Sequence, residues 1–146
     1  MRKPIAAVLG AAALAIPNLN AYAAATAPAA AAKTKVVIAT RSFTGTPGTA
    51  GRWGEVQVTI VVRRTTTTNL TTKKKTVKRR ITAVQVPAYP NHTDRSIFIN
   101  QQALPILIQE TMSAQSSGID LVSGASDTSQ GFQQSLQSAI LKARAW

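Results

Sequence analysis

Hydrophobic and polar residues alternate most clearly over Glu55 to Arg64. Every second residue there is a branched aliphatic side chain, and polar residues occupy most of the places between them. The aliphatic residues are Val56, Val58, Ile60 and Val62. A period of two is typical of a strand that buries one of its faces. The pattern therefore predicts a half-buried strand in this segment.

Two further segments have strand character. Lys35 to Thr44 is rich in Val, Ile, Thr and Phe, and it is followed by a loop, Gly45 to Gly54, with four glycines and one proline. Arg79 to Val86 alternates less cleanly and ends at Pro87, which cannot donate a hydrogen bond to a neighbouring strand. We expect this last strand to pair with the one at Glu55 to Arg64 as a hairpin.

After a loop at 87–94, apolar residues recur at spacings of three and four. Ser96 to Ala114 is therefore predicted to be helical, with Ser96 available to cap its start. Pro105 predicts a division into a short first helix and a second one that has the proline in its first turn. A short extended piece, Ile119 to Val122, precedes a terminal amphipathic helix of about Ser129 to Ala143. Strands followed by helices imply an α+β domain, with the helices on one face of a small antiparallel sheet.

The N-terminal residues have the organisation of a secretory signal peptide. A basic start, an apolar run of 12 residues from Ile5 to Ile16 and the small-x-small triplet Ala21-Tyr22-Ala23 place the signal peptide at 1–23. An uncleaved anchor is the alternative, but the run is too short to span a bilayer and Pro17 follows it. An Ala/Pro-rich tether, 24–34, leads to a domain at 35–146. We expect an exported protein in the periplasm or on the outer face of the cytoplasmic membrane.

Composition excludes several kinds of site. The 146 residues include no Cys and one His, so disulfides, thiolate metal sites, cysteine nucleophiles and multi-histidine sites cannot be built. His92 lies in a Pro/Asn-rich loop and is interpreted as a solvated turn residue rather than a catalyst. No carboxylate pair or nucleophile with a partner base supports a hydrolase.

The charge is concentrated in one hairpin. The chain has 17 basic and 5 acidic residues, a formal charge of +12, and a Thr/Lys-rich insertion at 64–79 holds most of the hairpin's cations. The hairpin's basic residues are Arg63, Arg64, Lys73, Lys74, Lys75, Lys78, Arg79 and Arg80. They form either a docking surface for an anionic partner or a solvated extension that resists edge-to-edge aggregation. Nucleic acid is not expected, because the protein is exported and no aromatic residue interleaves the cations.

One segment resembles a known motif. Asp120 followed by Ser123-Gly124-Ala125-Ser126 is similar to the sequence D-x-x-[ST]-G-A-[ST]-x-[ST] of the FMN-binding domain family. That family includes the flavin-carrying subunits of sodium-pumping NADH:quinone oxidoreductase and of its ferredoxin-linked relative. The strand Trp53 to Val58 resembles the W-G-x-V-Q-V of small exported members, and Asp94 to Glu110 resembles the segment that precedes the motif. The likeness covers about Arg52 to Ala143.

The resemblance implies a covalent cofactor. It makes Ser126 the acceptor of FMN through the cofactor's phosphate, attached by a flavin transferase that uses FAD as donor. Asp120 would help the transferase recognise or activate the acceptor. The resemblance also places Ser123, Gly124, Ala125 and Thr128 in the cofactor site. Two features differ from the family: the usual acceptor is Thr, and Asp127 adds a carboxylate next to the phosphate.

A structural alternative exists for the motif, because Ser-Gly-Ala-Ser followed by Asp-Thr-Ser could simply cap the last helix. With Asp120 at the right offset and the flanking segments in order, the flavin interpretation is favoured. The sequence then predicts an electron-transfer module rather than a self-sufficient enzyme, since the redox chemistry would belong to FMN. Its redox partner is not indicated, and a membrane electron-transport complex is one candidate. The alternative function is a non-flavinylated module that docks an anionic partner through its basic hairpin.

Overall fold

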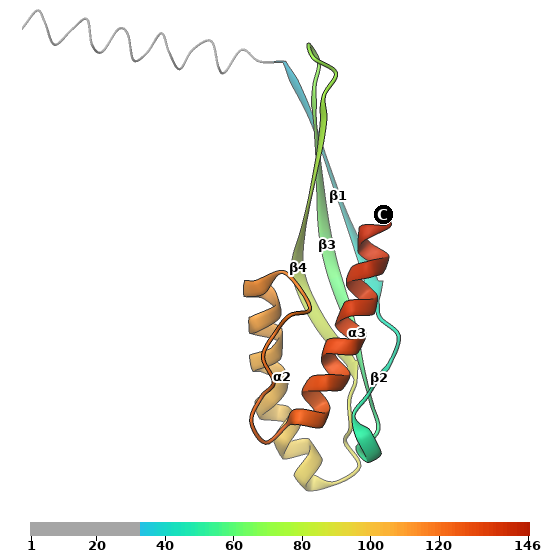
Figure 1. Ribbon diagram of the computed structural model, residues 1–146, viewed down its shortest axis with the longest axis vertical. Helices are drawn as coiled ribbons and strands as arrows, with labels where there is room; N and C mark the ends of the chain where they lie inside the picture. The colour runs from blue at the N-terminus through green and yellow to red at the C-terminus, as the bar shows by residue number, and fades with distance from the viewer. Residues whose placement is uncertain (1–32) are drawn as a thin grey trace, which may run out of the picture. The chain divides into compact units, whose positions relative to one another are not determined.

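A computed structural model describes residues 33–146 (Figure 1). The predicted signal peptide, 1–23, and nearly all of the predicted tether, 24–34, lie outside the described residues. Within the described part of the chain, no helix combines the length and the apolar character needed to cross a membrane.

A four-stranded antiparallel sheet is organised around β3, Glu55–Asn69, which pairs with every other strand. Its partners are β1, Thr34–Thr44, the very short β2, Gly48–Thr49, and β4, Lys75–Ala88. The register of β2 places Gly48 opposite Val56 and Thr49 opposite Glu55. The predicted α+β class with a small antiparallel sheet is confirmed, as is the hairpin made by the second and third predicted strands.

The β3–β4 hairpin is longer than the pattern predicted. Both strands continue into the Thr-rich insertion and leave only residues 70–74 as a turn, because threonine is β-branched and favours extended backbone even without burial. Contacts divide the described chain into two units, 33–36 with Thr67–Thr76, and Val37–Thr66 with Val77–Trp146. In the first unit the Asn69 carboxamide oxygen accepts from the backbone N–H groups of Thr71, at 2.9 Å, and Thr72, at 3.0 Å.

Helix α2, Asp94–Ala114, is continuous, so the predicted division at Pro105 is wrong. Pro105 is exposed, whereas Leu104, Leu107 and Thr111 form one buried stripe on both sides of it. Burying this stripe on a single helix outweighs the one hydrogen bond that the proline cannot make. Ser96 is not the cap. The side chain of Thr93 caps the helix by accepting from the backbone N–H of Ser96 at 3.1 Å.

Helix α3, Ser126–Arg144, begins earlier than the predicted Ser129. The segment Ile119 to Val122 belongs to no strand. Instead, Ile119 is buried in the core, and the backbone N–H of Val122 donates to the hydroxyl of Ser129 at 3.0 Å. A side chain of α3 therefore replaces the strand partner that this segment lacks.

Both helices contribute to one core on the inner face of the sheet (Figure 1). The alternating aliphatic residues of β3 are buried, while Gln57, Thr59 and Val61 between them stay partly exposed. Helix α2 contributes mainly Leu104 and Leu107. Helix α3 contributes Phe132, Leu136, Ala139 and Ala143 to the same core.

Glycine allows α3 to approach the sheet closely. A Cβ atom on Gly48 would lie 2.0 Å from the carbonyl oxygen of Gly131, and one on Gly45 would lie 1.9 Å from the carbonyl oxygen of Ser135. The buried Ser135 hydroxyl also accepts from the backbone N–H of Val58 at 2.8 Å. These contacts fix the position of α3 on β2 and β3, and thereby the place where its first turn begins.

Candidate functional site

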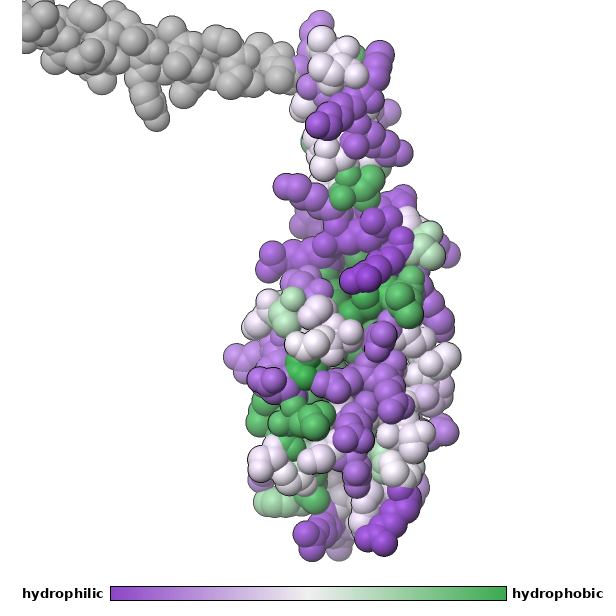
Figure 2. Space-filling model, viewed as in Figure 1, coloured by the Kyte–Doolittle hydropathy of each residue, from purple (hydrophilic) through white to green (hydrophobic). Residues whose placement is uncertain are grey.

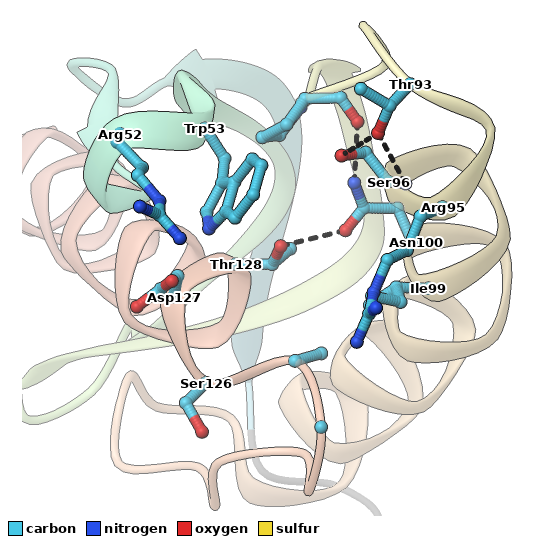
Figure 3. A pocket seen from close by; sticks show the side chains of 13 residues that line it. Arg52, Trp53, Thr93, Arg95, Ser96, Ile99, Asn100, Ser126, Asp127 and Thr128 are labelled. Atoms are coloured by element: carbon cyan, nitrogen blue, oxygen red, sulfur yellow. Dashed lines mark hydrogen bonds between the residues drawn. The ribbon is translucent and has the colours of Figure 1, made fainter.

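The starts of α2 and α3 open onto one pocket of about 380 Å³ (Figure 3). This volume lies within the range of small-molecule sites. Arg52 and Trp53 of the short 3-10 helix η2, Gly51–Trp53, form one side. The remaining lining residues are Pro90, Thr93, Arg95, Ser96, Ile99 and Asn100 from the loop and helix α2, and Gly124, Ala125, Ser126, Asp127 and Thr128 at the start of α3.

The first turn of α3 lacks a side-chain cap. Its N-cap residue is Ala125, which has no side-chain acceptor, and the first hydrogen bond of the helix is donated by the Ser129 N–H to the Ala125 carbonyl at 2.9 Å. The N–H groups of 126–128 thus have no partner within the helix. The alternative in which the Ser/Gly motif caps its own helix is therefore wrong. Uncapped N–H groups and the helix dipole favour an anion at this end.

Ser126 is the first residue of α3, and its side chain is exposed at the edge of the pocket (Figure 3). Gly124 precedes it with a φ of 82°, a left-handed conformation that favours glycine, and nothing lies within 4 Å of a Cβ built there. The buried Ala125 packs beneath the turn. The Ser126 hydroxyl is thus accessible at the start of the helix.

Thr128 and Asn100 join the two helices beneath the pocket. The Thr128 hydroxyl donates to the Asn100 Oδ1 at 2.8 Å, and the Asn100 Nδ2 donates to the Pro90 carbonyl at 2.6 Å. Asn100 is only 1% exposed. The structure therefore places Thr128 among the lining residues, and its hydroxyl proton is used to hold α3 against α2.

Ser129 holds the loop that precedes α3 through two hydrogen bonds. Its buried hydroxyl donates to the Ala125 carbonyl at 2.8 Å and accepts from the Val122 N–H at 3.0 Å. This side chain is internal, so Ser129 does not compete with Ser126 as an exposed hydroxyl.

Arginine and tryptophan side chains supply the pocket's charge and its flat surface. The Arg52 guanidinium lies 4.7 Å from the centroid of the Trp53 ring, which is 42% exposed. In Figure 3 Arg52 extends toward Asp127, and Arg95 enters from the α2 side. Asp127 also lies next to Gly51, since its Cγ is 3.7 Å from the place of a Cβ on that glycine. Two cations and two helix starts therefore face one carboxylate among the lining residues.

Asp120 and Ser123 are not among the lining residues. Both are exposed in the loop before α3. His92 is exposed in the loop before α2 and also does not line the pocket.

Sequence reasoning assigned no role to Arg52, Trp53, Arg95 or Asn100. Trp53 and Asn100 were noticed only as matches to the family's segments, and nothing in the local pattern shows that a loop after β2 reaches the start of α3. The signal that could have found them is Gly48, where the absence of a side chain lets the chain pass close to α3.

The pocket residues fit FMN. The uncapped turn and two arginines suit a phosphate, Ser126 offers a hydroxyl for a phosphoester, and Trp53 offers a flat face for an aromatic ring. Asp127 is the one group that opposes an anion there. Comparison with known proteins finds no family model and no curated protein that matches the chain. The likeness to the FMN-binding domain family therefore remains a resemblance carried by the residues quoted above.

Proposed function

We propose that this protein is an exported FMN-binding module that carries FMN covalently on Ser126, through the cofactor's phosphate, and transfers electrons outside the cytoplasm. The observation that carries the proposal is the coincidence at the start of α3. An exposed acceptor hydroxyl, an uncapped first turn and a pocket with two arginines and an exposed tryptophan all occur at one place.

Attachment is an exchange of one phosphate ester for another. The Ser126 oxygen bonds to the FMN-side phosphorus of FAD, the bond from that phosphorus to the bridging oxygen breaks, and AMP leaves. The hydroxyl proton passes to a base of the flavin transferase, which would contact the exposed Asp120. No oxidation or reduction accompanies this step.

Residues around the first turn of α3 would then stabilise the FMN attached to Ser126. The N–H groups of the first α3 turn, together with Arg52 and Arg95, stabilise the negative phosphodiester. Trp53 provides a stacking surface that also excludes water from one side. FMN, when bound, supplies one- and two-electron transfer. The protein contributes attachment, orientation and charge.

The test is co-expression of the full chain with a flavin transferase, followed by intact mass and in-gel flavin fluorescence after denaturation. The wild type should gain the mass of FMN less one water. Ser126→Ala should stay folded, colourless and unmodified, and Ser126→Thr should be modified at least as well as wild type. Covalent fluorescence in Ser126→Ala would refute the assignment.

Two variants of exposed loop residues complete the design. Ser123→Ala removes a neighbouring exposed hydroxyl and should be modified normally, so it is the matched control for Ser126→Ala. Asp120→Asn should fold but remain mostly unmodified, because it removes the carboxylate offered to the transferase. Equal modification of Asp120→Asn and wild type would remove Asp120 from the proposal without affecting Ser126. A wild-type chain that stays colourless while binding acidic partners would favour the non-flavinylated alternative.

A further inference from the structure

A second cavity, of about 220 Å³, lies at the opposite end of α3 from the FMN pocket. Ile60, Val62 and Ile81 from β3 and β4 form its apolar floor, and these side chains are nearly completely buried. Arg79, Arg80 and Arg144 are among its lining residues, and all three are exposed. In Figure 2 strongly hydrophilic side chains gather over this end of α3 and the neighbouring strands.

The three arginines have no partner of opposite charge at the cavity. None of the chain's five acidic residues is among the lining residues. Within residues 33–146 no hydrogen bond is donated by these three guanidinium groups, whereas Arg64 nearby is held by the carbonyl and ring of Trp146. Guanidinium groups left free around a cavity are suited to a phosphate group, because their paired N–H donors match its oxygens.

Apolar residues on the same part of α3 indicate where that phosphate is found. Leu141 is 55% exposed, next to Lys142 and one turn or less from Arg144, and Trp146 is partly exposed beyond them. An exposed leucine among cations, with a half-buried tryptophan near it, is found on protein surfaces that rest at a membrane interface. A nucleic-acid backbone would give Leu141 no comparable apolar environment.

The distance from the FMN pocket argues against a docking surface for the redox partner. Helix α3 has 19 residues, which at 1.5 Å per residue separates its ends by about 27 Å. If FMN is held at Ser126 as proposed above, a partner bound at the arginines would be too far for direct electron transfer, since tunnelling falls steeply with distance. Binding to a membrane sets no such limit on the distance from the flavin.

We infer that Arg79, Arg80 and Arg144 bind the phosphate of an anionic membrane lipid and hold this end of α3 against an anionic bilayer. The closed floor admits a headgroup and not an acyl chain. Leu141 enters the interface beside it. Only the exclusion of a redox partner rests on the proposed function; lipid binding itself does not need flavin attachment.

The test measures partitioning of the full chain onto phosphatidylcholine vesicles with and without phosphatidylglycerol. The triple variant Arg79→Gln, Arg80→Gln, Arg144→Gln should bind the anionic vesicles about 100-fold more weakly than wild type, at roughly fivefold per charge near the surface. The matched control changes Lys73, Lys74 and Lys75 to Gln, which removes the same charge from residues that do not line the cavity and should weaken binding clearly less. All variants share the same N-terminal residues, so their contribution cancels in the comparison.

Charge-conserving and competition experiments separate a built site from general attraction. Replacing the three arginines with lysine should weaken binding several-fold, because the charge remains and the paired donors are lost. Equal losses in the two glutamine variants, or wild-type binding by the lysine variant, would overturn the site. Release from vesicles by inorganic phosphate at constant ionic strength would assign the cavity to a free phosphate instead. Tighter binding to a short oligonucleotide than to vesicles would assign it to nucleic acid. Circular dichroism and the thermal midpoint should match wild type throughout.

Discussion

Replacing Asn100 with alanine should destabilise the protein and loosen the start of α3. The substitution removes two hydrogen bonds, at 2.8 Å from Thr128 and at 2.6 Å to Pro90, from a residue that is 1% exposed. The Thr128 hydroxyl and the Pro90 carbonyl would then be unpaired in a buried place. Each unsatisfied group costs about 1–3 kcal/mol, so we expect unfolding to become easier by roughly 2–5 kcal/mol.

The assay is urea denaturation of the full chain without flavin, followed by tryptophan fluorescence, for Asn100→Ala, Thr128→Val and the double variant. Thr128→Val keeps the side-chain shape and should cost about 1–2 kcal/mol, since it leaves only the Asn100 oxygen unpaired. Because the two residues are in contact, the double variant should cost less than the sum by about 1 kcal/mol. Strict additivity, or a loss below about 0.5 kcal/mol for Asn100→Ala, would show that this pair does not hold α2 and α3 together.

Three further changes test other parts of the argument. Gly48→Ala should destabilise by at least about 3 kcal/mol, because its Cβ would meet the Gly131 carbonyl at 2.0 Å, whereas the exposed Gly118→Ala control should stay within about 0.5 kcal/mol in the same urea titration. Pro105→Ala should raise the free energy of unfolding by about 1–3 kcal/mol, as an exposed proline inside α2 gives way to the best helix former; an unchanged value would contradict this account of α2. If FMN is carried on Ser126 as proposed, Trp53→Leu should leave its attachment intact and increase flavin fluorescence, because a ring able to stack on the flavin and quench it is removed; unchanged emission would separate Trp53 from the flavin.

The parts of the fold that the sequence predicted are those in which burial follows a regular period. The strand at Val56 to Val62 alternates without interruption, and the apolar spacing of the last helix marks its buried stripe. The predicted break in α2 was wrong because burial of side chains outweighed the local effect of a proline. Pro105 suggested a local break, but the stripe formed by Leu104 and Leu107 on one continuous helix decided the outcome.

The sequence predicted the site residues that are neighbours within one motif, but not those that tertiary contacts bring to the pocket. The motif located Gly124, Ala125 and Ser126, and the structure places these three residues at one pocket. Arg52 and Trp53 reach that pocket because glycines let the loop after β2 approach α3, a tertiary contact that no periodicity reports. Asp120 and Ser123 are close in sequence to the pocket residues, but they are exposed and do not line the pocket.

The two helix starts at the pocket differ in a way that stability alone does not explain. The N-cap residue of α2 is Thr93, whose side chain accepts from a backbone N–H. Such a cap contributes about 1 kcal/mol compared with alanine. The N-cap residue of α3 is Ala125, although serine residues occur nearby at 123 and 126. A fold shaped only for stability would place a capping side chain there. Alanine leaves the N–H groups of the first turn free toward the pocket. On the proposed function, these N–H groups are left for the phosphate of FMN on Ser126.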